Sequence, residues 1–290
     1  PINDLKEPDL LPLINASEML GKYMPKNSII VYESTVFPGA TEEFCVPVLE
    51  SISGYKYKID FNVGYSPERI NPGDKKRTIR KIKKIVSGDS DHSLRIISEI
   101  YSKIIDAGII KAKSIKTAEA AKVLENTQRD INIGLMNEFS NICNALDLNT
   151  KEVLELAATK WNFLNFFPGL VGGHCIGVDP YYLAYIAKKR GLDPKIILSA
   201  RETNDNVPNE IIKQIKFKLS EKQIYHKNVK TCFLGVTFKE NVPDTRNSLA
   251  LTLANSLKKE GFDIKICDPF IQEEISGFKN NSFLEIENEI

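Results

Sequence analysis

The chain has 290 residues and carries 39 basic against 38 acidic side chains, a formal net charge of +1. Its 42% hydrophobic and 27% charged residues are typical of a globular protein and exclude a disordered or fibrous chain. The balanced charge argues against a nucleic-acid partner or a membrane surface, and no apolar run is long enough to cross a bilayer. The length predicts two or three domains.

Five cysteines and three histidines are scattered along the chain without the spacing of metal ligands. The cysteines form no Cys-x-x-Cys pair, so a disulfide framework and a zinc site are both disfavoured. We therefore predict no metal site. Because free cysteines persist in reducing compartments, we also predict a cytoplasmic location.

The first third of the chain alternates predicted helices with strands. Apolar spacing predicts a helix at 9–22, a strand at 28–32, a helix at 40–52, strands at 59–65 and 83–87, and a helix at 90–104. Such alternation is typical of a parallel sheet with helical crossovers.

The middle third is predicted to be helical. Residues 114–146 keep helical spacing without a proline, which predicts one long helix or two nearly collinear ones, and further helices are expected at 150–159, 181–190 and 194–204. After Pro208, a linking helix to about 224 leads into a second strand–helix–strand unit at 229–235, 246–260 and 263–267. We therefore expect an α/β fold in which two α/β domains flank an all-helical one, with boundaries at 1–113, 114–207 and 208–290.

The densest chemical signal is the stretch 168–180, Pro-Gly-Leu-Val-Gly-Gly-His-Cys-Ile-Gly-Val-Asp-Pro. Its glycines allow the backbone to approach a ligand closely. Cys175 emerges from this loop four residues before Asp179, which can cap the next helix, and the thiol is placed to act as a nucleophile. A buried structural cysteine in a turn-rich connection explains the same residues equally well.

Lys122 and Asn126 lie four residues apart on one face of the long predicted helix. An ammonium and an amide that point together can stabilise an oxyanion. A solvated helix face is the commoner explanation of such a pair.

Three loops that follow predicted strands carry further candidates. Thr35 lies in the loop 33–39, Glu68 lies in the loop 66–73, and Lys239 and Arg246 lie in the segment that follows the strand 229–235. Loops at the carboxyl ends of parallel strands bind ligands in α/β folds, and cations beside a helix N-terminus suit a phosphate. Taken one at a time, each of these residues is more simply explained as an ordinary polar residue of a loop.

No Gly-x-Gly-x-x-Gly follows a predicted strand, so the usual dinucleotide-binding fingerprint is missing from the chain. By pattern alone, the chain does not qualify as an NAD enzyme.

Taken in order, five motifs resemble those of the UDP-glucose/GDP-mannose dehydrogenase family. They are Glu-Ser-Thr-Val-x-Pro-Gly, Pro-Glu-Arg-Ile-x-Pro-Gly, Lys-x-x-x-Asn on a long helix, Gly-Gly-x-Cys-x-x-x-Asp and Phe-Lys-x-x-x-x-Asp-x-Arg. The resemblance extends from about Asp9 to Phe270. The glycine loop and the Lys-Trp-Asn-Phe-Leu at 160–164 are similar to the branch that oxidises UDP-N-acetylglucosamine or UDP-N-acetylgalactosamine for capsule and O-antigen polysaccharides.

The resemblance implies two Rossmann-like α/β domains joined by a central helical domain, whose long helix forms a homodimer contact. It also implies that the chain begins within the NAD-binding domain and stops within the UDP-binding domain, so that the glycine fingerprint precedes Pro1. We therefore expect this chain to bind NAD weakly and a UDP-sugar better.

The resemblance further implies a four-electron oxidation of carbon 6 of the sugar, with NAD as cofactor. Cys175 would add to the aldehyde to form a thiohemiacetal, the second oxidation would give a thioester, and water would release the uronate. Lys122 and Asn126 would stabilise the oxyanion, and Asp179 would assist proton movement.

The remaining implied roles belong to loop residues. Thr35 would position the hydrolytic water, and Glu68 is the candidate base. The implied substrate contacts are Glu68, Arg69, Ile70, Asn71, Lys122, Asn126, Gly172, Phe238 and Lys239. The implied cofactor contacts are Ser34, Thr35, Glu68, Cys175 and Arg246.

Departures from the family pattern bear on the substrate. Val178 stands where UDP-glucose enzymes carry lysine, and the partner-subunit arginine of those enzymes has no counterpart at Thr159–Lys160. Both differences favour the N-acetylhexosamine branch, although the basic residue expected there is replaced by Phe167. The alternatives are a UDP-glucose 6-dehydrogenase and a non-catalytic fragment that dimerises and binds UDP-sugars.

Overall fold

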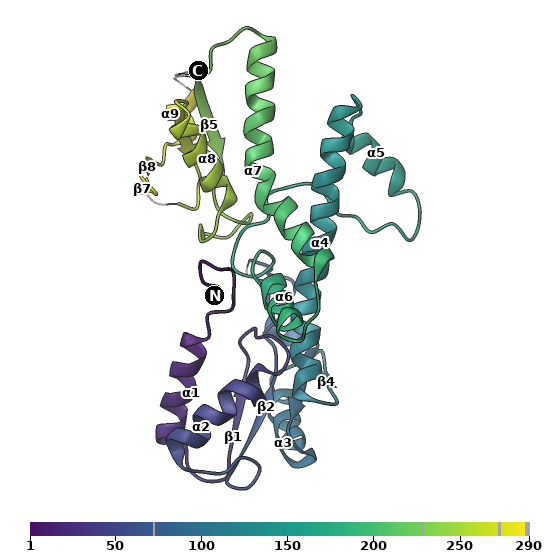
Figure 1. Cartoon of the computed structure of the whole chain (residues 1–290), viewed down its shortest axis with the longest axis vertical. Coiled ribbons are helices and arrows are strands. Elements are labelled where there is room, and N and C mark those ends of the chain that lie inside the picture. Colours follow the sequence, from purple (N-terminus) through teal and green to yellow (C-terminus); the bar gives the residue numbers. More distant parts are fainter. Residues whose placement is uncertain (72, 228, 272–273, 288–290) are drawn as a thin grey trace. The chain divides into compact units, whose positions relative to one another are not determined.

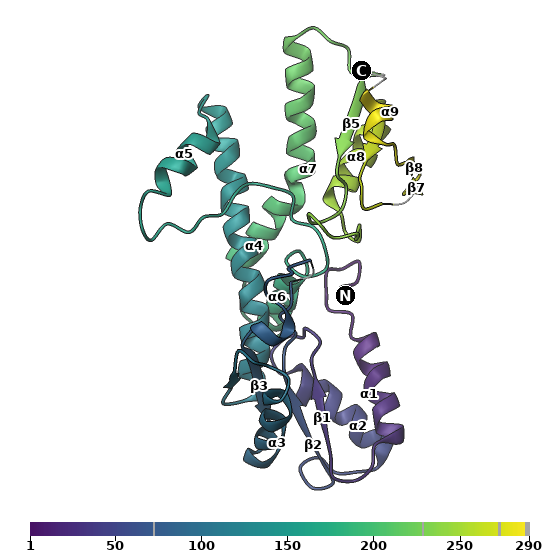
Figure 2. The same ribbon diagram turned by 180° about the vertical axis from the view of Figure 1, so that it is seen from behind.

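The structure, a computed structural model, describes residues 1–71, 73–227, 229–271 and 274–287. The chain forms two compact units, which Figures 1 and 2 allow the reader to follow by colour. The first unit contains Pro1–Gln128 and Val178–Lys195, and the second contains Arg129–Gly177 and Ile196–Ile290. The helical middle of the chain therefore divides between the units. The three domain boundaries expected from the sequence stay a prediction.

The first unit contains a four-stranded sheet with the strand order β1-β2-β3-β4. Its strands are β1 (Ser28–Tyr32), β2 (Phe61–Tyr65), β3 (Lys84–Gly88) and β4 (Ile109–Lys111). β1 and β2 are parallel, as are β3 and β4, but β2 and β3 run antiparallel. The prediction of a wholly parallel sheet was wrong at this pair. A parallel pair needs a long crossover, and the described residues between β2 and β3 hold only a 3₁₀ turn, Ile79–Lys81.

Helices cover this sheet and complete its core. They are α1 (Leu11–Tyr23), the π-helical turn Thr41–Cys45 that continues into α2 (Val46–Ser53), α3 (Asp91–Ser102) and α6 (Asp179–Lys189). α1 packs against α2, and α3 packs against β2 and β3. The core contains the fully buried side chains of Phe37, Leu49, Phe61 and Tyr65. Burial of each such side chain stabilises the fold by about 1.5–3 kcal/mol.

The long helix α4 (Ile115–Ala145) confirms the helix predicted at 114–146. It begins in the first unit and ends in the second. Five buried charged or amide side chains lie along it at helical spacing. They are Glu119, Lys122, Asn126, Asp130 and Asn137.

The second unit contains a parallel β5–β6 pair joined by a helix, which confirms the predicted strand–helix–strand unit. Its elements are α5 (Thr150–Ala157), α7 (Lys195–Glu221, of which Lys195 belongs to the first unit), β5 (Lys230–Leu234), α8 (Leu249–Lys259), β6 (Asp263–Cys267), β7 (Glu274–Ile275), β8 (Phe278–Lys279) and α9 (Phe283–Glu287). The core around α8 contains Leu253, Leu257 and Ile266.

α7 is one helix that contains Pro208, and the prediction of two helices separated at this proline was wrong. A proline lacks the N–H that bonds to the carbonyl four residues earlier and usually kinks a helix without ending it when packing holds both halves. Figure 1 shows the axis of α7 changing direction along its length. Pro208 and Ile212 are both buried, so packing continues across the interruption.

Among the described residues, no helix combines the length and the apolar character needed to cross a membrane. The two longest helices, α4 and α7, both carry charged side chains throughout.

We predict that Gly64→Ala destabilises the protein by about 1–3 kcal/mol, because overpacking a filled core forces its neighbours to move. A methyl group on Gly64 of β2 would lie 2.6 Å from the carbonyl oxygen of Ser87 and 2.3 Å from the side chain of Ile97. Chemical denaturation measures the change. The matched control is Gly54→Asn, at a left-handed helix end with open space around it (φ 70°), where asparagine is tolerated. Equal effects of the two changes would contradict the packing argument.

Candidate active site

Asp179 forms a buried cluster with Lys122 and Asn126 in the first unit. Lys122 Nζ lies 3.4 Å from Asp179 Oδ2, and Asn126 Nδ2 donates a hydrogen bond of 2.5 Å to the same oxygen. Lys122, Asn126 and Asp179 are 7%, 4% and 2% exposed, respectively. The interpretation of Lys122 and Asn126 as a solvated helix face was therefore wrong. A buried carboxylate needs such donors, because an unpaired buried charge is costly.

Local sequence explains how these residues meet. Lys122 and Asn126 are one turn apart on α4, so their side chains share a face. Asp179 is the first residue of α6, with Pro180 beside it in the first turn. An acidic residue is favourable at a helix N-terminus, where the exposed amides carry partial positive charge.

Glu68 lies in the loop after β2, and three donors fix its carboxylate. Oε1 accepts hydrogen bonds from the backbone amides of Arg69 (2.7 Å) and Ile70 (2.6 Å), and Oε2 accepts one of 3.4 Å from Lys84 Nζ. Lys84 is only 4% exposed and also pairs with Glu33, at 3.1 Å. Because β3 runs antiparallel to β2, its first residue lies at the edge where β1 and β2 end.

Sequence reasoning missed Lys84. It is the last of seven basic residues in the run 75–84, and composition does not distinguish it from its neighbours. The signal that could have found it is the apolar strand that begins at this residue, since a lysine there must leave solvent and find a partner.

Arg69 and Tyr101 extend the contacts of these loops. Arg69 Nε donates a hydrogen bond of 2.9 Å to Glu125 on α4, and Tyr101 donates one of 2.5 Å to Glu33. Burial is the main cause that raises the pKa of Tyr101, and the Glu33 carboxylate raises it further. Ile70 is largely exposed.

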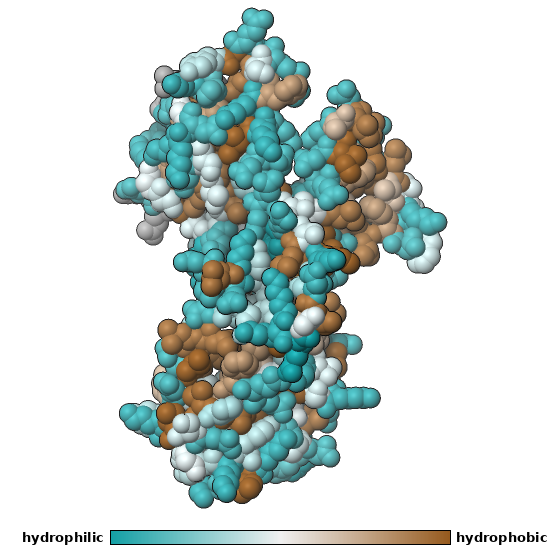
Figure 3. Space-filling view, viewed as in Figure 1, coloured by the Kyte–Doolittle hydropathy of each residue, from teal (hydrophilic) through white to brown (hydrophobic). Residues whose placement is uncertain are grey.

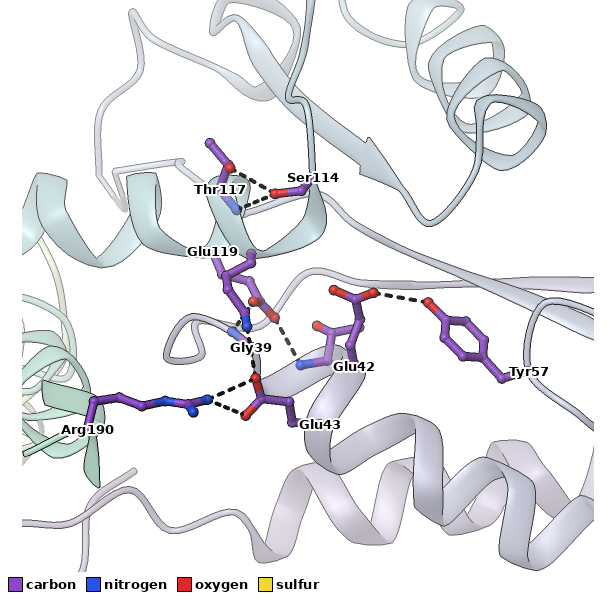
Figure 4. Close-up of polar contacts among 10 residues, drawn as sticks. Gly39, Glu42, Glu43, Tyr57, Ser114, Thr117, Glu119 and Arg190 are labelled. Carbon is purple, nitrogen blue, oxygen red and sulfur yellow. Dashed lines mark hydrogen bonds and ion pairs between the residues drawn. The ribbon is translucent and has the colours of Figure 1, made fainter. Parts of the chain in front are cut away.

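The loop that carries Ser34 and Thr35 is held by a buried acid of α4. Glu119 accepts hydrogen bonds from the backbone amides of Gly39 (2.5 Å) and Thr41 (2.9 Å), as Figure 4 shows. Burial raises the pKa of the Glu119 carboxyl, while the donated hydrogen bonds lower it. Ser34 is exposed and Thr35 is half-buried, so both hydroxyls lie near the surface beyond β1.

Ion pairs surround the same turn. Glu43 binds Lys116 of α4 at 2.9 Å and Arg190 at 3.2 Å (Figure 4). Both cations lower the pKa of the Glu43 carboxyl, Lys116 through its hydrogen bond most of all. The turn after Thr35 is therefore attached to α4 at two points.

Cys175, in the second unit, is exposed, whereas Cys45 of the first unit and Cys143 of the second unit are buried. The interpretation of Cys175 as a buried structural cysteine was therefore wrong. The backbone amide of Gly173, two residues earlier, donates to the carbonyl of Asn247 at 3.2 Å. Gly172 lies beside the same carbonyl and within reach of Phe238. The glycine loop is thus packed on the loop before α8.

Arg246 lies in that loop and is bound by Asp244. The guanidinium donates to both oxygens of Asp244, at 2.6–3.1 Å, and the Arg246 amide also bonds to this carboxylate. Arg246, mainly through its side chain, lowers the pKa of Asp244 to about 2. α8 begins at Leu249 with Ser248 as its N-cap, so the predicted start at residue 246 was wrong. Lys239 and Phe238 are half-buried.

The described residues contain no group of three or more histidine, cysteine, aspartate or glutamate side chains that could hold a metal ion. The first unit thus presents buried hydrogen-bond donors and fixed carboxylates, and the second unit presents an exposed thiol. Such groups suit covalent catalysis with oxyanion stabilisation.

Comparison with known proteins identifies three segments of one family. Profiles of the UDP-glucose/GDP-mannose dehydrogenase family match residues 1–105 (NAD binding domain), 116–206 (central domain) and 232–289 (UDP binding domain).

Curated relatives match almost the whole chain. The chain is 53% identical over 268 residues to protein CapL of Staphylococcus aureus, covering 92% of this chain and 63% of that protein. It is 52% identical over 274 residues to UDP-N-acetyl-D-glucosamine 6-dehydrogenase of Salmonella typhi, covering 94% and 64%. The chain therefore spans less than two thirds of the length of these relatives.

A solved structure shows the same fold. The UDP-D-ManNAc dehydrogenase of Pyrococcus horikoshii superposes with a TM-score of 0.86 and 31% identity, covering 94% of this chain and 64% of that one. The expected fold, with two Rossmann-like domains and a helical domain between them, is confirmed.

We predict strong energetic coupling between Lys122 and Asp179. Lys122→Met leaves a buried carboxylate without its cation and destabilises the protein by about 3 kcal/mol. In a double-mutant cycle with Asp179→Asn, the two changes should couple by about 1–3 kcal/mol, as measured by urea denaturation. The exposed pair Lys151–Glu155, at 3.8 Å, is the control and should couple by less than about 0.5 kcal/mol. Similar coupling in both pairs would contradict the prediction.

Proposed function

Because the chain belongs to the UDP-glucose/GDP-mannose dehydrogenase family, we propose that it acts in the NAD-dependent oxidation of carbon 6 of a UDP-N-acetylhexosamine to the UDP-uronic acid. The observation that carries this proposal is the buried carboxylate of Asp179, which receives two donors from α4 and follows the exposed Cys175 by four residues. A nucleophilic thiol and a fixed proton-handling cluster are the two requirements of acyl-enzyme chemistry.

The proposed nucleophile is Cys175. In the first oxidation, carbon 6 loses a hydride and its hydroxyl loses a proton, which gives an aldehyde. The Cys175 thiolate then adds to the carbonyl carbon of this aldehyde, and the oxygen takes a proton to give a thiohemiacetal. Loss of a hydride from that carbon and of the hydroxyl proton leaves a thioester. Water adds to the thioester, and the C–S bond breaks to release the uronate and the thiol. NAD, when bound, accepts the hydride of each oxidation.

Lys122 and Asn126 are proposed to stabilise the negative charge that develops on the C6 oxygen. Their donors are already oriented, because both side chains are buried and share Asp179 as an acceptor. Donors fixed before the reaction need no reorganisation when charge develops. Asp179, the carboxylate that accepts hydrogen bonds from both donors, would then relay protons between the thiol and the hydrolytic water.

Thr35 and Glu68 are proposed to act at the water and the substrate. Both follow parallel strands, so their loops leave the same edge of the sheet. Nucleotides bind at this edge in α/β folds. Thr35 would position the water, and the fixed carboxylate of Glu68 is the proposed base.

The same edge fits NAD, since Ser34 and Thr35 present hydroxyl groups there and the loop of Glu68 lies beside them. The residues that would hold the cofactor are Ser34, Thr35, Glu68, Cys175 and Arg246. Arg246 suits a diphosphate, because its planar guanidinium stays charged and is oriented by Asp244.

The proposed substrate is UDP-N-acetylglucosamine or its galacto epimer. Identity is 52% with the UDP-N-acetyl-D-glucosamine 6-dehydrogenase of S. typhi and 31% with the UDP-D-ManNAc dehydrogenase of P. horikoshii. Val178, where a UDP-glucose enzyme would carry lysine, supports the same branch. The proposed substrate contacts are Glu68, Arg69, Ile70, Asn71, Lys122, Asn126, Gly172, Phe238 and Lys239.

A role in surface polysaccharide biosynthesis and a cytoplasmic location complete this proposal. UDP-uronic acids are activated sugars, and a transferase that joins sugars is the class of enzyme that would use them. None of the five cysteines, all within the described residues, is in a disulfide bond, which fits a reducing compartment.

We also propose a homodimer, with the contact on the long helix α4 that the family resemblance implies and with an exposed apolar surface of the second unit, here named the α5 patch, as part of the same interface. The α5 patch consists of Leu146, Leu148, Leu156, Trp161, Leu164 and Phe167, all exposed. Trp161 is the most exposed of the six, at 89%. Figure 3 shows apolar side chains gathered over α5 and the adjoining end of α4. An exposed apolar surface of this kind marks a contact with another protein.

The proposed reaction predicts a specific product. The protein, supplied with UDP-N-acetylglucosamine or UDP-N-acetylgalactosamine and with NAD in large excess to offset the weak NAD binding expected of this chain, should form the uronate, which mass spectrometry detects. UDP-glucose should be converted at least about tenfold less efficiently, because a site built to hydrogen-bond the acetamido group would be left with unpaired polar groups when UDP-glucose binds. Faster conversion of UDP-glucose would instead support the UDP-glucose 6-dehydrogenase.

Cys175→Ser should abolish uronate formation while UDP-sugar binding, measured by calorimetry, stays within about threefold, because a serine hydroxyl is a far weaker nucleophile than a thiolate. The matched control is Cys232→Ser, since Cys232 is also exposed. Normal uronate formation by Cys175→Ser would exclude the covalent route.

The α5 patch predicts the oligomeric state. The wild-type chain should sediment as a dimer at micromolar concentration, and Leu156→Glu with Trp161→Ser should shift it toward the monomer. Large buried apolar and aromatic side chains contribute most to such interfaces, about 2 kcal/mol or more each. Leu5→Glu, at another exposed leucine, is the control. A wild-type monomer would rule out the proposed interface.

A further inference from the structure

Two reciprocal hydrogen bonds join the loop of Cys175 to Asn247. The amide of Gly173 donates to the carbonyl oxygen of Asn247, and the side-chain amide of Asn247 donates to the carbonyl oxygen of Gly173, both at 3.2 Å. The backbone carbonyl and the side-chain amide of Asn247 thus satisfy both the N–H and the carbonyl of Gly173. This pair of bonds is here named the Asn247 clamp.

The clamp explains why glycine occupies positions 172 and 173. A β-carbon on Gly172 would lie 2.6 Å from the Asn247 carbonyl oxygen. Gly173 has a φ of +81°, and a β-carbon there would lie 2.6 Å from the ring of Phe238. Gly169, in the same loop, has open space around it. Close approach, and not general flexibility, is therefore what these two positions require.

The other side of the clamp is anchored to a regular α/β element. Asn247 has a φ of +53°, in the left-handed region that asparagine tolerates better than most residues. The next residue, Ser248, caps α8 and donates a hydrogen bond of 2.6 Å to the carbonyl of Val236, which follows β5. The amide of Phe238 bonds to the carbonyl of Asp244 at 3.0 Å, which closes the loop.

His174, the residue before Cys175, touches this loop as well. Its ring lies edge-on to the ring of Phe238, with 5.6 Å between centroids. Its Nδ1 lies 4.0 Å from the carboxylate of Asp244, which also binds Arg246. The two residues that precede the thiol are therefore held by the segment that carries Lys239 and Arg246.

We propose that Asn247 is a positioning residue for Cys175, and that it links the thiol to the binding of a nucleoside diphosphate by the Lys239–Arg246 loop. The thiol's reactive role and the nucleotide contact of this loop rest on the function proposed above. An anionic diphosphate would be attracted to the two cations of the loop. Any shift of the loop on binding would reach the backbone of Gly173 through the clamp.

The test measures alkylation of each cysteine by iodoacetamide, followed by peptide mass spectrometry, on the whole chain. Asn247→Gly removes only the side-chain donor, because glycine keeps the left-handed backbone and its accepting carbonyl. We expect Cys175 alkylation and amide exchange at 172–175 to rise about two- to tenfold, the effect of one net hydrogen bond. Alkylation of Cys232, the internal control, should not change.

A second arm adds UDP. Saturating UDP should slow alkylation of Cys175 in the wild type, and the effect should disappear in Asn247→Gly although UDP still binds by calorimetry. UDP should also shift the pH profile of Cys175 alkylation in the wild type and leave that profile unchanged in Asn247→Gly. Such a difference would further support positioning, since a merely structural role of Asn247 would not depend on nucleotide.

Gly172→Ala and Gly169→Ala form a matched pair in the same loop. The first should reproduce the effect of Asn247→Gly, and the second should behave as the wild type. Identical Cys175 alkylation and exchange in the wild type and Asn247→Gly would overturn the proposal. Failure of either chain to bind UDP would count against the function proposed above, while the measurements without nucleotide would still decide the role of the clamp.

Discussion

The need to satisfy buried polar groups along α4 organises the segments that carry the candidate site. A buried charge or amide is costly without a partner, and α4 places five of them at helical spacing. Segments distant in the sequence supply their partners: the amides of Gly39 and Thr41 bind Glu119, Asp179 binds Lys122 and Asn126, Arg201 and Asn204 bind one oxygen of Asp130, and Gly169 binds Asn137. The loop after β1, the start of α6 and the start of the glycine loop therefore all depend on one helix.

Much of the fold could be predicted because apolar spacing reports local structure directly. The strand at 28–32 and the helix at 114–146 follow from unbroken runs of one period. The antiparallel β2–β3 pair and the continuous α7 could not be predicted in this way. Pairing direction depends on how the chain returns between strands, and a helix survives Pro208 only if packing holds both sides of it.

The residues of the candidate site also differ in whether the sequence alone could predict them. Cys175 could be found from the sequence, because a cysteine among glycines is unusual in its own neighbourhood. Lys84, Glu119 and Asn247 could not, since each acts on a partner between 16 and 80 residues away in the chain: 16 from Lys84 to Glu68, 74 from Asn247 to Gly173 and 80 from Glu119 to Gly39. Lys84 and Glu119 look like ordinary surface residues until tertiary structure buries them, and Asn247 stays exposed, so that only its hydrogen bonds to Gly173 distinguish it.

The two halves of the proposed chemistry are built from different kinds of structure, and this difference has a consequence for substitutions. Lys122 and Asn126 lie in the interior of a helix and support Asp179, so a change there removes both a buried contact and a donor that we propose to act on the oxyanion. Cys175 is exposed and contributes little to packing, so its replacement affects reactivity far more than stability. Asn247 stands between these cases, because its clamp orders a loop without belonging to a core. Preorganisation in this family member is therefore supplied twice, by burial along α4 and by close backbone approach at the glycine loop.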